Sequence, residues 1–213
     1  MAWNDVYCES VRHGNVIEDV YKTRFGIDKH SRASAIRDVV GRQLWDDYYT
    51  FGFVRDPYTR LLSLYTWLGK RLRSQHWKRY VRQFDRKNKI WQWPGMTAYL
   101  ESSNFSQFIR HPVIANGAEG APGAQPMTNW LADESGLIVD FVGRQESLAE
   151  DFSRLAETLK LGDISLPKLN VSGSKVQLKN FYADQSDLDL IYERYQQDFE
   201  LFGYERRSYQ SLD

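Results

Sequence analysis

The stretch that most constrains the fold of this chain is an apolar run that ends in an Arg-Asp-Pro triplet. The apolar and aromatic residues from 48 to 54 have the composition of a buried strand. Asp56 then stands where a helix N-cap is expected, and Pro57 where the first helical residue belongs. The sequence therefore predicts a strand followed directly by a helix, with Arg55 at the carboxyl end of the strand.

Arg55 and Ser63 are the candidate phosphate ligands of this strand and helix. Arg55 lies beside the positive end of the predicted helix, and Ser63 follows about two turns later, on the side of Arg60 and Trp67. A fixed guanidinium, a hydroxyl donor and a helix N-terminus together form a phosphate site. Each of these residues is common alone, so the prediction depends on their joint spacing.

Composition favours one domain over residues 1–213, because a chain of this length can bury a hydrophobic core. The 28 basic and 28 acidic residues cancel, which disfavours a general polyanion-binding surface. A single cysteine, Cys8, excludes an internal disulfide framework and a cysteine-rich metal site. We expect a soluble, cytoplasmic chain without a membrane span or signal peptide. A luminal enzyme separated from its membrane anchor would look similar.

The remaining pattern alternates strands and helices in the manner of an α/β domain. Ser31 and Gly41 have the positions of an N-cap and a C-cap around one helix. Two strands are predicted at 128–132 and 137–142, joined by a turn at 133–136. Further helices are predicted at about 104–110, 145–161 and 184–202.

The spacing Arg-Asp-Pro-x-x-Arg-x-x-Ser-x-Tyr, from Arg55 to Tyr65, resembles a known nucleotide-binding segment. It is similar to the 3′-phosphate-binding segment of carbohydrate-type (family 2) sulfotransferases, including short bacterial members. These enzymes use 3′-phosphoadenosine 5′-phosphosulfate (PAPS). Further segments resemble the same family in the same order, and the likeness covers roughly residues 29–205, with 1–28 outside it. Those segments begin at Gln125, Val139, Leu166 and Arg194.

The resemblance implies a P-loop-NTPase-like α/β fold with a mostly parallel central sheet flanked by helices. It implies transfer of a sulfuryl group from PAPS, the co-substrate, to a hydroxyl of a carbohydrate or similar acceptor, without a metal. Arg55 and Ser63 would hold the 3′-phosphate of the nucleotide, and Ser174 and Lys175 lie on a loop that can fold over it.

The resemblance makes His30 the first choice for the general base, because in this family a histidine just upstream of the Arg-Asp-Pro strand can serve this role. A histidine with a pKa near 6.5 is suited to accept a hydroxyl proton at neutral pH. His76 is the alternative base, and a capping or surface role for His30 is nearly as well supported. Arg144 either reaches a phosphate or, more in keeping with its neighbours, pairs with Glu146 or Asp151.

The glycine-rich loop that holds the 5′-phosphosulfate in this family is not found. Residues 1–28 contain only Gly14 and Gly26, and neither stands in a Lys-x-Gly-x-Thr context. We therefore expect the first strand and its loop to be missing from this chain. A shortened chain is the favoured explanation; the others are a nucleotide- or glycan-binding remnant of the family and a loop supplied by another chain. A nucleotide kinase is less favoured, because no Walker loop is found.

Residues 70–91 combine many basic side chains with interleaved aromatic rings. Rings stack on sugar faces and cations bind carboxylates or sulfates, so this stretch is the candidate rim for an anionic glycan acceptor. A solvated helix with an apolar stripe is the plainer alternative. Single-stranded nucleic acid is disfavoured by the neutral net charge and the lack of a recognised nucleic-acid-binding motif.

Overall fold

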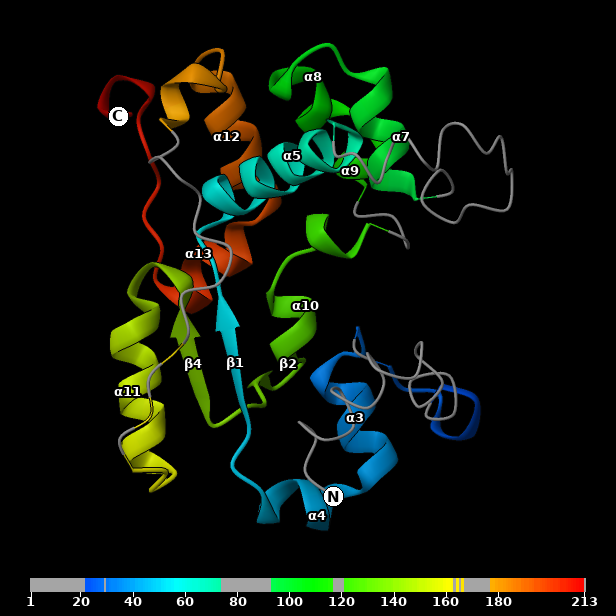
Figure 1. Ribbon diagram of the computed structural model, residues 1–213, viewed down its shortest axis with the longest axis vertical. Coiled ribbons are helices and arrows are strands. Elements are labelled where there is room, and N and C mark those ends of the chain that lie inside the picture. The colour runs from blue at the N-terminus through cyan, green and yellow to red at the C-terminus, as the bar shows by residue number, and fades with distance from the viewer. Residues whose placement is uncertain are drawn as a thin grey trace. The chain divides into compact units, whose positions relative to one another are not determined.

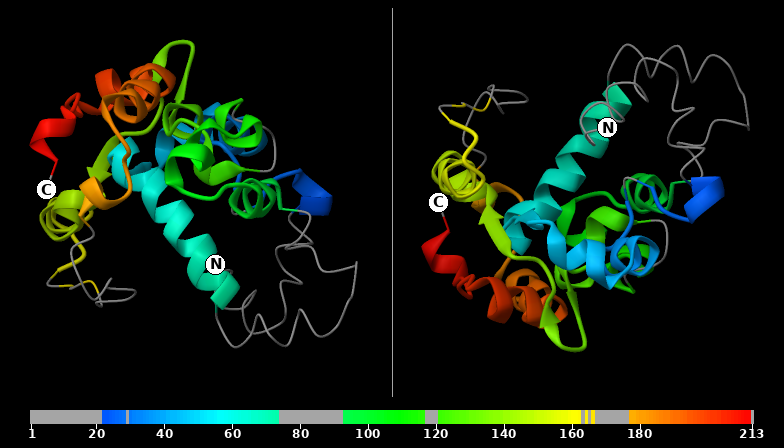
Figure 2. Two further views of the ribbon diagram at one scale, coloured as in Figure 1. Left: turned by 90° about the horizontal axis from the view of Figure 1, so that it is seen from above. Right: turned by 90° about the horizontal axis from the view of Figure 1, so that it is seen from below.

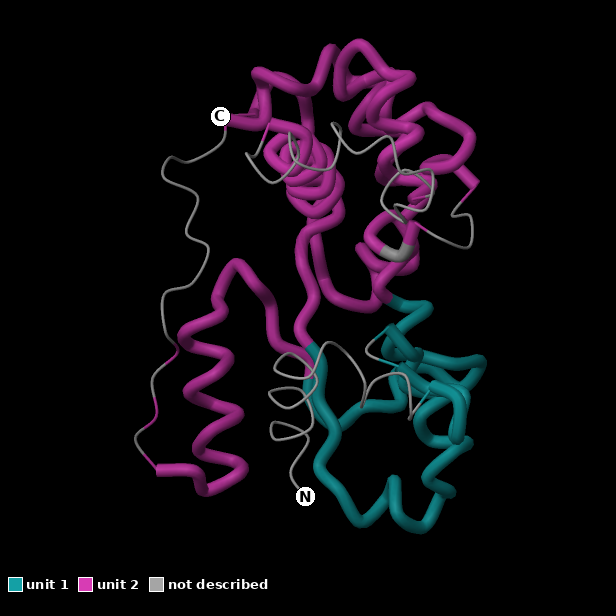
Figure 3. Tube along the Cα trace, turned by 45° about the vertical axis from the view of Figure 1, so that its right-hand side comes forward, with its two compact units in different colours: residues 1–52, 128–141 teal, residues 53–127, 142–213 magenta. Residues whose placement is uncertain are grey.

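The computed structural model of the chain describes residues 22–28, 30–73, 93–116, 121–162, 164, 166 and 177–212. These residues form an α/β structure and divide into two compact units (Figure 3). Unit 1 draws on residues 1–52 and 128–141, and unit 2 on residues 53–127 and 142–213. The single domain expected from the sequence stays a prediction.

The strand before the Arg-Asp-Pro triplet is confirmed. It is β1 (Phe51–Val54), and it pairs with β4 (Phe141–Arg144) in a two-stranded parallel sheet (Figure 1). Gly143 in β4 lies against the ring of Phe53, where an added Cβ would stand 2.3 Å from the ring atom Cε1. This close approach explains a glycine inside a strand.

We expect Gly143→Ala to lower the free energy of unfolding by about 1–2 kcal/mol, because the new methyl group overpacks the contact with Phe53. Gly95→Ala is the matched control, since the nearest atom to its added Cβ is 4.0 Å away and the residue lies in a helix. Urea denaturation of both variants checks the prediction. Equal stability of the two would contradict it.

Helix α5 (Pro57–Arg73) begins where the sequence predicts (Figures 1 and 2). The carboxylate of Asp56 accepts a hydrogen bond from the backbone N–H of Thr59 at 3.0 Å, which confirms Asp56 as the N-cap. The inner face of α5 is fully buried and supplies the centre of the core of unit 2. Its core residues are Tyr58, Leu61, Leu62 and Leu68.

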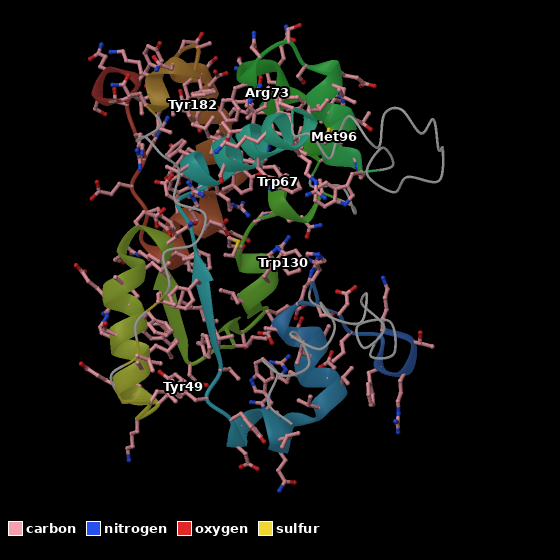
Figure 4. The ribbon with its side chains drawn as sticks, in the orientation of Figure 1. Tyr49, Trp67, Arg73, Met96, Trp130 and Tyr182 are labelled. Carbon is pink, nitrogen blue, oxygen red and sulfur yellow. The ribbon has the colours of Figure 1, made fainter. Side chains whose placement is uncertain are left out.

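Helices that follow α5 in the sequence complete that core. They are α7 (Pro94–Glu101), α8 (Phe105–Arg110), α9 (Pro112–Ala115), α12 (Gln185–Arg194) and α13 (Gln196–Phe202). The helix expected over 184–202 is interrupted at Tyr195, which separates α12 from α13. Tyr182 connects the segment before α12 to α5, because its hydroxyl donates to the carbonyl oxygen of Tyr58 at 2.9 Å. Tyr182 and Met96, both in this core, are labelled in Figure 4.

Helix α11 (Leu148–Thr158) follows β4 after the short 3-10 turn η2 (Gln145–Ser147). The buried carboxylate of Asp151 accepts hydrogen bonds from the backbone N–H of Arg144 and the hydroxyl of Ser147. These bonds fix the end of β4 to the first turn of α11. Three further 3-10 turns are η1 (Pro122–Ala124), η3 (Leu178–Asn180) and η4 (Tyr209–Ser211).

Unit 1 contains α3 (Ala33–Val40), α4 (Arg42–Asp47), α10 (Thr128–Leu131) and the antiparallel pair β2 (Ala132–Asp133) and β3 (Gly136–Leu137). The turn at 133–136 is confirmed, but the strand predicted at 128–132 is wrong, because four of its residues form α10. Ser31 is not the N-cap of α3, since its hydroxyl accepts from the N–H of Asp28. Gly41 ends that helix with a φ of 84°, as predicted.

Asp133 gives unit 1 a pH-dependent contact. Hydrogen bonds from Ser135 and the nearby Arg37 lower the pKa of Asp133 to about 2. The contribution of this carboxylate to stability is complete above the unfolded-state pKa of about 3.9 and is lost as the pH falls toward about 2. We expect Asp133→Asn to make the free energy of unfolding depend less on pH between about 2 and 3.9, as measured by urea denaturation at several pH values. The same pH dependence in the variant and the wild type would contradict this role of Asp133.

None of the helices in the described part of the chain has the length and apolar character that crossing a membrane requires.

Candidate phosphate-binding site

The residues after β1 and after β4 meet at one edge of the sheet. Because the two strands are parallel, their carboxyl ends lie side by side. The backbone N–H of Asp56, two residues past β1, donates to Oε1 of Glu146, two residues past β4, at 3.0 Å. Ligands of parallel α/β sheets bind at this edge.

Arg55 is held at one end of its side chain and open at the other. Its Nε donates to Oγ1 of Thr59 at 3.0 Å, while its two terminal nitrogens have no hydrogen bond or ion pair among the described residues. Burial lowers the pKa of Arg55, and the nearby carboxylate of Glu146 opposes this effect; a guanidinium stays charged in either case. The site therefore contains a half-buried, partly anchored cation.

Thr59 and Ser63 continue from Arg55 along one face of α5. They are four residues apart, and residues at this spacing are neighbours on a helix surface. The hydroxyl of Ser63, which is half-buried, has no hydrogen-bond partner in the part of the chain that the structure describes. The hydroxyl of Thr59 between them donates to the carbonyl oxygen of Asp56 at 3.1 Å, so Arg55 and Ser63 present the free donors. We call Arg55, Thr59 and Ser63 the α5 donor line. The binding of a phosphate by Arg55 and Ser63 stays a prediction.

Two details differ from the expected site. The N–H group of Thr59 is satisfied by the Asp56 carboxylate, so this group of the helix N-terminus is not a free donor. Arg60 belongs to the interior of unit 2, where it donates to the carbonyl oxygen of Gln125 and its guanidinium lies 5.1 Å from the centre of the Tyr195 ring. Its role is structural.

Four residues complete the site and were not predicted as its members: Thr59, Glu146, Tyr204 and Arg207. The hydroxyl of Tyr204 donates to Oε2 of Glu146 at 3.1 Å, and the guanidinium of Arg207 donates to the carboxylate of Asp56 at 2.8 Å. These partners are 58 and 151 positions apart in the sequence. Only the Arg55–Thr59 spacing of four residues offered a local signal.

Arg144 does not form the ion pair expected from the sequence. Its backbone N–H donates to Asp151, whereas its guanidinium donates to the carbonyl oxygen of Phe202 and lies over the ring of Tyr204 at 5.1 Å. The ion pair predicted with Glu146 or Asp151 is therefore wrong. The guanidinium instead ties β4 to the end of α13.

Of the other candidate residues, His30 belongs to unit 1, and the rest lie outside the described residues. His30 is exposed in unit 1, where its backbone N–H donates to the Asp28 carboxylate, and its role as a base stays a prediction. It is not among the residues that line a surface pocket of about 640 Å³ in that unit, which include Trp45 and Asp133. His76, Ser174 and Lys175 lie outside the described residues.

Trp67, in the second half of α5, forms an exposed aromatic pair with Trp93 next to the α5 donor line. Trp67, labelled in Figure 4, lies four residues after Ser63, and its ring centre is 5.4 Å from that of Trp93. Arg71 lies over the Trp67 ring at 5.7 Å. Most of the predicted basic rim, residues 74–91, falls outside the described residues.

Within the described residues, no group of three or more histidine, cysteine, aspartate or glutamate side chains is arranged to hold a metal ion.

The chain matches the sulfotransferase family over residues 8–205, and it belongs to that family. An uncharacterized protein of Archaeoglobus fulgidus is 25% identical over 126 residues, which cover 59% of this chain and 79% of that protein. No solved structure matches the chain significantly. The family expected from the sequence is thus confirmed, and the α/β structure with its parallel strands is consistent with it.

Proposed function

We propose that this protein transfers a sulfuryl group from PAPS to a hydroxyl of a carbohydrate or a similar acceptor. The observation that carries the proposal is the α5 donor line at the carboxyl edge of a parallel sheet, in a chain of the sulfotransferase family. In this proposal, Arg55 and Ser63 bind the 3′-phosphate of the nucleotide. The terminal nitrogens of Arg55 and the hydroxyl of Ser63, which have no partner among the described residues, together with the positive charge of Arg55, suit a phosphate group.

The 3′-phosphate site acts at a distance from the transferred group. The acceptor oxygen forms a bond to sulfur while the bond between sulfur and the 5′-phosphate oxygen breaks, and adenosine 3′,5′-bisphosphate leaves. A firm hold on the nucleotide places the breaking bond in line with the acceptor, which lowers the barrier without contact at sulfur. We propose that His30 acts as the general base and accepts the proton of the acceptor hydroxyl. We also propose that Ser174 and Lys175 belong to a loop that folds over the nucleotide.

For the acceptor we propose a glycan, anionic in character, bound along residues 70–91. Support comes from the described residues that flank this stretch, where the Trp67–Trp93 pair offers ring faces, and from Arg71 within it, which lies over the Trp67 ring. Ring faces stack on sugars, and a guanidinium binds a carboxylate or sulfate.

A transfer assay with radiolabelled PAPS tests the function. The full chain is incubated with labelled PAPS and a panel of neutral and carboxylated oligosaccharides, and labelled sugar is measured. Labelled product supports an enzyme. Binding of adenosine 3′,5′-bisphosphate without transfer to any acceptor would indicate a nucleotide-binding remnant, and preference for ATP with Mg²⁺ would indicate a kinase.

A further inference from the structure

Both oxygens of the Glu146 carboxylate accept hydrogen bonds from groups other than Arg55. Oε1 accepts from the backbone N–H of Asp56 at 3.0 Å, and Oε2 accepts from the hydroxyl of Tyr204 at 3.1 Å. Arg55 and Glu146, which the structure describes in full, form no ion pair with each other. This is unexpected, because the negative charge of Glu146 is near enough to Arg55 to oppose the lowering of its pKa by burial.

The Glu146 carboxylate could compete with a bound anion for the Arg55 guanidinium. A guanidinium and a carboxylate pair readily in a bidentate geometry, and such a pair would occupy the same nitrogens that a phosphate needs. Two hydrogen bonds from other groups hold the Glu146 carboxylate in its position. One comes from the fixed backbone, and the other depends on a single hydroxyl group.

Tyr204 is itself held firmly in the segment that follows α13. Gly203 turns the chain there with a φ of 64°, and the Arg144 guanidinium lies over the Tyr204 ring at 5.1 Å. Three residues later, Arg207 donates to the Asp56 carboxylate at 2.8 Å. The segment 203–207 therefore contacts Arg144 and Glu146 at the end of β4, and also Asp56 just after β1.

We propose that Tyr204 is a positioning residue of the phosphate site: its hydroxyl keeps the Glu146 carboxylate from pairing with Arg55, so that the guanidinium remains available for the 3′-phosphate of the nucleotide. This inference rests on the proposed function, because it takes Arg55 as a ligand of that phosphate. The segment 203–207 would thereby contribute to the selection of nucleotides that carry a 3′-phosphate.

A double-mutant cycle on the full chain tests the proposal. Calorimetry gives the dissociation constants of adenosine 3′,5′-bisphosphate and adenosine 5′-monophosphate, and their ratio measures the preference for a 3′-phosphate. Tyr204→Phe keeps the ring but frees Oε2 of Glu146, so the preference should fall about three- to tenfold. Adding Glu146→Gln removes the competing charge, so the double variant should recover the preference.

Recovery of the preference in the double variant separates a positioning role from a general loss of structure. A loss of structure would weaken the binding of both nucleotides, and Glu146→Gln would not restore it. Arg206→Gln is the control in the same segment, because Arg206 pairs with Asp189 instead; its preference should equal that of the wild type. Glu146→Gln alone gives a second reading and should keep or raise the preference. An unchanged preference in Tyr204→Phe, or a loss that the double variant does not restore, would overturn the inference. If Arg55→Ala also leaves the preference unchanged, the proposed phosphate site itself is wrong.

Discussion

Replacing Arg55 with alanine should weaken the binding of adenosine 3′,5′-bisphosphate about tenfold to 100-fold. The proposed phosphate contact uses the two terminal nitrogens that are free among the described residues, and a hydrogen bond between charged groups contributes about 1.5–3 kcal/mol. The affinity for adenosine 5′-monophosphate should change little, since it lacks the group that Arg55 binds. Titration calorimetry with both nucleotides measures the effect.

Two variants sharpen this experiment. Arg55→Lys should restore only part of the affinity, because an ammonium lacks the planar pair of donors and cannot be anchored through Nε as Arg55 is to Thr59. Arg42→Ala removes an exposed arginine that pairs with Asp46 in unit 1, and it should bind as the wild type does. Equal binding by Arg55→Ala and Arg42→Ala would remove Arg55 from the site.

Replacing Asp56 with alanine should lower the free energy of unfolding by about 2–4 kcal/mol. The buried carboxylate caps α5 through the N–H of Thr59 and accepts a charged hydrogen bond from Arg207. Loss of an N-cap costs about 1 kcal/mol, and loss of a hydrogen bond to a charged group about 1.5–3 kcal/mol, reduced here because Arg207 is partly exposed. The midpoint of urea denaturation should fall with an unchanged slope.

Asp189→Ala is the matched control for Asp56→Ala. Asp189 also pairs with an arginine of the C-terminal segment, Arg206, but both side chains are accessible to water. An exposed ion pair contributes at most about 1 kcal/mol, so this variant should unfold close to the wild-type midpoint. If the two variants lose the same stability, Asp56 does not hold the turn as described.

The part of the site that was predicted from sequence depends on local signals. Asp56 and Pro57 mark a helix start through backbone chemistry that acts within one turn, and the structure confirms both. The spacing from Arg55 to Ser63 is likewise a property of the first turns of one helix. For the same reason Gly41 was identified as a helix end.

What the sequence did not predict depends on contacts between distant segments. Glu146 reaches the N–H of Asp56 only because β1 and β4 lie in parallel, and no local pattern records that pairing. The strand expected at 128–132 failed because a short apolar run fits one helical turn as well as a strand. The interior position of Arg60 was missed because an arginine is expected at the surface.

The most direct measurement is a crystal structure of the full chain with adenosine 3′,5′-bisphosphate. We expect the 3′-phosphate within hydrogen-bonding distance of the Arg55 guanidinium and the Ser63 hydroxyl, with Glu146 still bonded to Tyr204. A nucleotide bound elsewhere, with Arg55 and Ser63 free of it, would show that these two residues are not the phosphate ligands.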